Sequence, residues 1–285
     1  MLLVIKRVIL IQNKKQLVMY IIIVFVLILL FLGIGLIVYK SAFEDTESKN
    51  NNNDDELNTL GLRLYNYVNI REGEFILFDT ENVLTYNDLQ EDKKLMLVHA
   101  LIPNTAKTIN EECGDDSTNC IKESISQRVF QRYYDRLFGR DKNINYQNYF
   151  EYIDCLDCYF EDGMYQCKKS ECKDVNSVVQ YINYDSVKMN SNDVILNVKS
   201  IFVSADGVYK DKSLQNKLDS IDYYNEVRSK LSDEDYYKGL TNHNNLNYNN
   251  FLKRLFEKYV DAAVYEVTFK EYDDNYYWYS TRLVK

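Results

Sequence analysis

An uninterrupted apolar run near the N-terminus constrains this chain more than any other feature. Residues 17–39 read LVMYIIIVFVLILLFLGIGLIVY and contain no charged side chain. A helix needs about 20 apolar residues to cross a hydrocarbon core, and a buried soluble helix is rarely apolar on every side over such a length. The run also exceeds the apolar core of a secretory signal, about 7–15 residues, and no clear small-x-small cleavage site follows it. We therefore expect an uncleaved transmembrane helix over residues 17–39, in contact with the lipid bilayer.

The charges that flank this run predict its orientation. Four cations precede it and no acidic residue occurs among the first 16 positions, whereas acidic side chains follow soon after Lys40. Lys and Arg are enriched on the cytoplasmic side of membrane helices. Residues 1–16 are therefore expected to form a cytoplasmic arm. The protein would cross the cell membrane once, with its C-terminal domain outside the cell.

The part of the chain beyond the apolar run is acidic. Residues 44–285 carry 29 basic and 43 acidic side chains, a net charge of −14. Phosphate backbones repel such a domain, so we expect no binding of nucleic acid. No calcium-loop motif of the D-x-[DN]-x-[DN]-G type occurs, and the Asp206-Gly207 pair is more typical of a turn.

Composition divides the outer part into a stalk and a folded domain. Residues 40–56 are polar, acidic and rich in Asn, and such a segment cannot offset its ordering entropy. We expect it to be a flexible stalk. Residues 57–285 regain periodic apolar positions and are long enough for one domain of upper-middle size or two small ones.

Periodicity within residues 57–285 predicts both helices and strands. Helical spacing is found from Leu57 to Val68, from Leu89 to Leu101 with Asn87 or Asp88 as N-cap, over 121–139 with Gly139 as the stop, and over 248–261. Strands are expected near 75–78, on both sides of Asp162-Gly163, over 178–184, 193–204 and 207–210, and as a terminal hairpin over 264–284. This order predicts an α+β domain with helices packed on an antiparallel sheet, for which a cystatin-like or NTF2-like fold is an analogy.

Six cysteines all follow the apolar run, and four of them lie between 155 and 172. The spacing C-x2-C-x8-C-x4-C could supply four thiolates to zinc, but an oxidising extracytoplasmic setting and an even count favour disulfides. We expect all six to be disulfide-bonded: Cys113, Cys120, Cys155, Cys158, Cys167 and Cys172.

The register of the hairpin around Asp162-Gly163 predicts which cysteines pair. Cys158 and Cys167 lie equally far from this turn, and Cys155 and Cys172 lie one step further out. A nested ladder, Cys158–Cys167 inside Cys155–Cys172, would join the two arms. The two remaining cysteines would close a small acidic loop as Cys113–Cys120. A redox-active C-x-x-C would instead require a Cys155–Cys158 bond, which the acidic surroundings disfavour.

Several features together resemble a known kind of protein. They are the basic arm, the single span, the Asn/Asp-rich stalk, the helix ending YDRLFGRD (134–141) and the tail YEVTFKEYDDNYYWYS (265–280). This combination resembles uncharacterised single-pass membrane-anchored surface proteins of low-GC Gram-positive bacteria. The resemblance implies a surface-exposed bacterial protein of unknown function, and it transfers no catalytic residue.

The residues that usually carry catalysis are sparse. His99 lies in an apolar helical stretch, where a structural role is more common than catalysis, and His243 lies in a polar loop. No nucleophile elbow, H-E-x-x-H or phosphate-binding loop occurs, so no catalytic, cofactor or metal residue is predicted. The YYWYS run (276–280) could stack on sugars but is more typical of a strand that alternates between core and solvent.

We expect a non-enzymatic extracytoplasmic module that binds a cell-envelope protein or glycan. The alternative is a carboxylate-based envelope hydrolase that acts on glycan, since acidic side chains are abundant. A deep pocket with two carboxylates at a catalytic separation would favour the hydrolase, and a shallow surface with exposed Tyr and Trp would favour binding.

Overall fold

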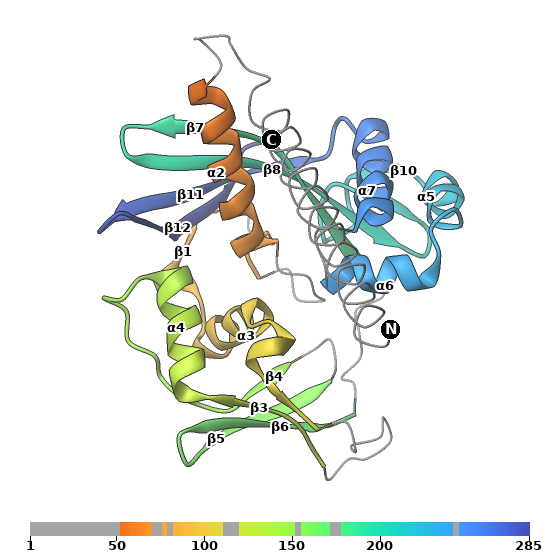
Figure 1. Ribbon diagram of the computed structural model, residues 1–285. Helices are drawn as coiled ribbons and strands as arrows, with labels where there is room; N and C mark the ends of the chain where they lie inside the picture. The colour runs from red at the N-terminus through yellow and green to blue at the C-terminus, as the bar shows by residue number, and fades with distance from the viewer. Residues whose placement is uncertain are drawn as a thin grey trace, which may run out of the picture. The chain divides into compact units, whose positions relative to one another are not determined.

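The structure is a computed structural model (Figure 1). It describes residues 52–69, 76–78, 82–110, 120–151, 155–171, 178–241 and 245–285. The chain from Asp54 to Lys285 forms one compact unit. Within the described residues, no helix has both the length and the apolar character that crossing a membrane requires. The predicted span at 17–39 and the arm before it lie outside this part of the chain.

The larger of the two sheets is antiparallel and has seven strands. Its order is β1-β12-β11-β8-β9-β10, and β7 also pairs with β8. The bounds are β1 Leu84–Thr85, β7 Val179–Asn190, β8 Asp193–Ser204, β9 Gly207–Tyr209, β10 Lys217–Ser220, β11 Ala263–Tyr272 and β12 Asn275–Leu283. Three of the strands expected from periodicity and the expected terminal hairpin are therefore neighbours in this sheet.

The smaller sheet has five antiparallel strands in the order β2-β3-β6-β5-β4. They are β2 Thr108–Ile109, β3 Ile121–Ser126, β4 Tyr149–Glu151, β5 Leu156–Glu161 and β6 Met164–Lys169. Asp162 and Gly163, both with positive φ, form the turn between β5 and β6. This turn type matches the right-handed twist of the paired strands, and the hairpin predicted at Asp162-Gly163 is confirmed.

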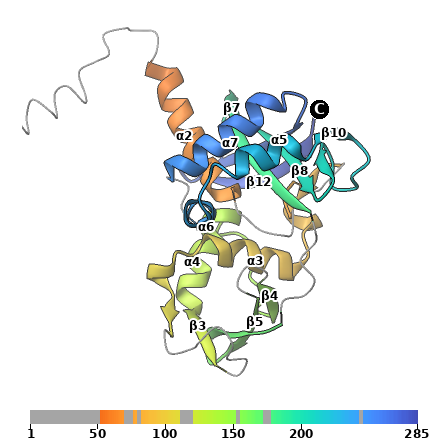
Figure 2. The same cartoon turned by 90° about the vertical axis from the view of Figure 1, so that its right-hand side faces the viewer.

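Six α-helices and two 3₁₀ turns are described. They are α2 Asn52–Val68, α3 Glu91–Leu101, α4 Gln127–Phe138, α5 Asp222–Arg228, α6 Asp233–Thr241, α7 Leu246–Lys258, η1 Tyr86–Asp88 and η2 Asn104–Ala106. Figures 1 and 2 show α3 and α4 beside the smaller sheet, and α5, α6 and α7 gathered at one end of the larger sheet. The α+β class is confirmed, with two sheets where the sequence suggested one.

Two groups of buried side chains hold these layers together. The larger joins α2, α3 and α4 to both sheets through residues such as Leu64, Leu95, Phe130, Tyr165 and Phe269. The smaller packs α5 and α7 onto β7, β8 and β9. Because one cluster reaches both sheets, the helices between them are positioned by a shared core.

The first helix begins earlier than the sequence suggests. The stalk was expected to continue to residue 56, but α2 already begins at Asn52. Asp54 and Asp55 lie in its first turn, where negative charge interacts favourably with the helix dipole. Acidic composition, interpreted as a sign of an unstructured stalk, therefore also suits the start of a helix.

The predicted helix over 121–139 is wrong in its first third. Residues 121–126 form β3, and the helix α4 begins only at Gln127. Ser126 separates the two, because its Oγ accepts a hydrogen bond from the backbone N–H of Val129 and caps the helix. Gly139, with φ of 95°, ends α4 as predicted. Pairing of β3 with β6 overrides the helical spacing of its isoleucines.

Two shorter segments also differ from expectation. Residues 76–78, expected as part of a strand, form a turn. The helix expected from Leu89 begins at Glu91, because Asp88 accepts hydrogen bonds from the backbone N–H and the hydroxyl of Thr85. That capping box closes a separate 3₁₀ turn before the helix.

The inner disulfide of the predicted cysteine ladder is confirmed. Cys158 and Cys167 lie directly opposite each other on β5 and β6 and form a disulfide. This pairing is incompatible with a Cys155–Cys158 redox pair and removes two thiolates from the alternative zinc site. Cys120 and Cys155 are also disulfide-bonded. The expected partners of these two, Cys113 and Cys172, lie outside the described residues, so both pairings stay predictions.

Candidate functional site

Four arginines recur at every fourth position along α4 and just beyond it. They are Arg128, Arg132, Arg136 and Arg140. Positions four apart lie on one side of a helix, about 6 Å apart along its axis. The opposite side carries the buried anchors Phe130, Tyr134 and Leu137. Burial of that apolar side therefore directs the arginine row to the surface, where all four are exposed.

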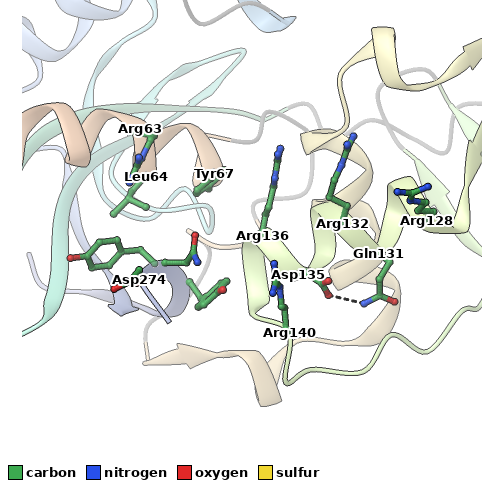
Figure 3. A pocket seen from close by; sticks show the side chains of 13 residues that line it. Arg63, Leu64, Tyr67, Arg128, Gln131, Arg132, Asp135, Arg136, Arg140 and Asp274 are labelled. Atoms are coloured by element: carbon green, nitrogen blue, oxygen red, sulfur yellow. Dashed lines mark hydrogen bonds between the residues drawn. The ribbon is translucent and has the colours of Figure 1, made fainter. Parts of the chain in front are cut away.

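This row forms one wall of a surface groove, which has a volume of about 630 Å³. Arg63 and Tyr67, one turn apart on α2, contribute a second part of the lining, and the start of β12 contributes Tyr276 and Tyr277. Figure 3 shows Arg132 and Arg136 extending side by side from α4, with Arg63 projecting from α2. The volume lies in the range of ligand-binding clefts.

Arginine charge dominates the groove. Five arginines line it against two aspartates, Asp135 and Asp274. None of the five guanidinium groups has a carboxylate of the described residues within ion-pairing distance. Asp135 instead accepts a hydrogen bond from the Gln131 amide at 2.7 Å (Figure 3). A domain with a large excess of acidic residues thus has a groove whose lining is net positive.

Tyrosine rings order part of this positive row. The guanidinium carbons of Arg132 and Arg136 lie 5.2 and 5.0 Å from the ring centroid of Tyr133, within cation–π distance. Across the groove, burial raises the pKa of Tyr276 and of Tyr277, so both phenols are neutral donors at pH 7. The groove therefore offers guanidinium groups, neutral phenol hydroxyl groups and some apolar ring surface to a ligand.

A second cluster of ionisable side chains is buried between α3 and the smaller sheet. His99 Nε2 lies 2.5 Å from Glu123 Oε1, and Lys107 Nζ lies 3.2 Å from Glu123 Oε2. His99 Nδ1 shares a hydrogen bond of 2.6 Å with the Tyr149 hydroxyl. Burial alone would raise the pKa of Glu123, but its contacts with His99 and Lys107 outweigh burial and hold that pKa below its ordinary value.

The buried cluster is almost fully shielded from solvent. His99 is 2% exposed and Glu123 4%. His99 also comes within 4.8 Å of the sulfurs of Cys158 and Cys167, but these sulfurs are bonded to each other and cannot act as thiolates. The arrangement is that of a satisfied structural histidine, the role that the sequence favoured for His99. His243 lies outside the described residues.

The aromatic YYWYS run (276–280) alternates between core and solvent, as is common for a strand. Trp278 is 3% exposed and donates a hydrogen bond from Nε1 to Thr281 Oγ1, whereas Tyr279 is 47% exposed. The strand therefore alternates between core and solvent, and its tryptophan is not available for stacking on a sugar. Within the tail over 265–280, Tyr276 and Tyr277 line the candidate site together with Asp274 and Asn275.

The arginine groove was not predicted from the sequence. The four-residue repeat of arginine is visible there, and three of the four arginines lie within the helix expected over 121–139, but the arginines were not singled out. Arg63, about 65 positions before the row, could be joined to it only by the tertiary structure. Comparison of the chain with protein-family models, curated proteins and solved structures finds no match.

Proposed function

We propose that the chain is a membrane-tethered extracytoplasmic module that binds an anionic ligand in the arginine groove. The uncharged run at 17–39 and the cations before it support the tether and its orientation. The arginine groove supports binding, because a cluster of guanidinium groups that form no ion pair with a described carboxylate is a ready receptor for carboxylate, sulfate or phosphate oxygens. A cell-envelope component that carries such groups is the expected partner.

The observation that carries this proposal is the contrast between α4 and the other surface helices. On α6 and α7, opposite charges occupy positions four apart, as in Glu234–Lys238 and Lys253–Glu257. Glu226 of α5 likewise pairs with Lys230, just beyond the end of that helix. On α4 the same spacing holds like charges, which destabilises a helix by a few tenths of a kcal/mol per pair, on the order of 0.2–0.5. Arg128 also lies in the first turn, where the helix dipole disfavours a cation. Binding of an anionic ligand explains why α4 carries a row of arginines that lowers the stability of the helix.

A retention experiment with the full chain in a non-ionic detergent tests the proposal. Although the protein is acidic, we expect it to bind a phosphocellulose column at pH 7 and to elute with salt. The double variant R132Q/R136Q should elute at a clearly lower salt concentration. The matched control K14Q/K15Q removes two cations from the N-terminal arm and should elute with the wild type.

Two results would contradict the proposal. One is passage of the wild-type protein through the column at low salt. The other is the reverse ranking, in which K14Q/K15Q loses retention and R132Q/R136Q keeps it, because retention would then come from the arm. Circular dichroism of each variant establishes that the fold is retained.

A further inference from the structure

The shape of the arginine row suggests a ligand class narrower than anions in general. We infer that the groove holds a linear phosphodiester polymer, laid along α4 with successive phosphates on successive arginines. This inference rests on the proposed anion-binding function and adds to it the geometry and chemistry of the ligand. Its basis is that three of the arginines follow one another along a single helix instead of converging on one point.

The spacing of the row matches a phosphodiester chain. Arg128, Arg132 and Arg136 rise about 6 Å per step and turn about 40° about the helix axis at each step. Six single bonds separate adjacent phosphorus atoms across a three-carbon diol phosphate, and at the extension per bond of a polypeptide these reach about 7 Å. Each repeat carries one negative charge and two free oxygens, which suit one guanidinium fork. The freely rotating linker can follow the turn of the row, which is harder for the rings of a uronate glycan.

The use of arginine instead of lysine in the groove also favours a phosphodiester ligand. Lysines outnumber arginines 24 to 10 in this chain, yet all five cations that line the groove are arginines. Lysine supplies a point charge, whereas arginine supplies a planar fork that matches two oxygens of one anionic group. The groove therefore selects for bidentate anions and not merely for negative potential.

The aromatic rings near the row favour a polyol backbone over nucleotides. Single-stranded nucleic acids bind by stacking successive bases on exposed aromatic faces. Here Tyr133 is engaged by the guanidinium groups of Arg132 and Arg136, and Tyr276 and Tyr277 are half-buried.

A length series of synthetic glycerol phosphate oligomers, one to six repeats, tests the inference. Binding to the full chain in non-ionic detergent is measured by fluorescence anisotropy. We expect Kd to tighten by about fivefold or more per added phosphate up to four repeats, because hydrogen bonds between charged groups are the strong ones, and then to level off. The slope of log K against log salt for the four-repeat oligomer should be about −2 to −3 and should fall by about 1.4 in magnitude in R132Q/R136Q.

The variants separate bidentate recognition from charge alone. R132K/R136K keeps the charge and should weaken binding of the four-repeat oligomer by about tenfold. R254K changes an exposed arginine on α7, outside the groove, and should leave Kd unchanged within about twofold.

Several outcomes would overturn the inference. Inositol hexakisphosphate binding more tightly than the hexamer would indicate a compact ligand, and oligogalacturonate of equal charge binding equally well would indicate a carboxylated glycan. An oligothymidylate that binds more tightly than the glycerol phosphate hexamer would indicate a nucleic acid. In each of these cases the anion-binding function survives. It fails together with the inference only if none of the probes binds.

Discussion

Replacing the buried Glu123 by glutamine should destabilise the domain more than any conservative change of a surface carboxylate. The substitution keeps the size of the side chain and removes its charge. Lys107, whose side chain is 9% exposed, then loses the carboxylate 3.2 Å away, and His99 loses its partner at 2.5 Å. Removing one member of a buried ion pair costs about 3–5 kcal/mol, and the retained amide places the expected loss near the lower end.

Thermal unfolding of the full chain measures this loss. A domain of this size shifts its Tm by about 2–4 °C per kcal/mol, so E123Q should unfold about 6–12 °C below the wild type. The control is E226Q, in which an exposed carboxylate loses a salt bridge with Lys230, worth about 0–1 kcal/mol. A Tm of E123Q that equals that of E226Q would refute the reasoning.

The pH dependence of the difference in Tm between wild type and E123Q gives a second test. Because the folded-state pKa of Glu123 lies below its ordinary value of 4.5, the charge contributes stability that is complete well above that value. This contribution is lost as the pH falls through the lowered folded-state pKa. Since glutamine does not titrate, the difference in Tm between wild type and E123Q should be largest near pH 7 and should shrink below about pH 4. A difference that grows on acidification would contradict this assignment.

Three further perturbations have outcomes that the structure predicts. G239A should lower the unfolding free energy in urea by about 1–3 kcal/mol, because the added methyl group overlaps Tyr248, although the same change in an open helix is favourable. S204A should raise the pKa of Asp206 from about 2 towards 3.8, followed by carboxyl NMR titration, because the Ser204 hydroxyl is the main group that lowers it. W278A should cost about 3–5 kcal/mol by circular dichroism melting and W278F clearly less, since the indole is buried in the core. A stabilised G239A, an unchanged Asp206 titration or equal melting of the two Trp278 variants would contradict the respective argument.

Local patterns in the sequence were sufficient for the hairpins. Two positive-φ residues at Asp162-Gly163 set the register that places Cys158 opposite Cys167, so the distance of each cysteine from the turn predicted the disulfide. The terminal hairpin was predictable for the same reason, since Tyr265, Val267 and Phe269 alternate with more polar residues along β11. In both cases the interacting residues are close in sequence.

Elements with long-range partners were predicted less well. Residues 121–126 have helical spacing, but they pair with β6, and Glu123 is buried only because His99 and Lys107 are brought beside it from other elements. No window of local sequence contains those partners. Tertiary pairing therefore determined the structure of this segment against its local preference.

The sequence by itself determined the apolar run, the acidic balance, the α+β class and the four-residue repeat of arginine. Only the tertiary structure decided what that repeat means. Burial of Phe130 and Tyr134 turns the arginines to one surface, and α2 and β12 bring Arg63 and Tyr277 to the same groove. A repeat of one residue type fixes spacing along a helix, whereas a binding site requires groups that converge in space. That convergence depends on packing between segments far apart in the chain.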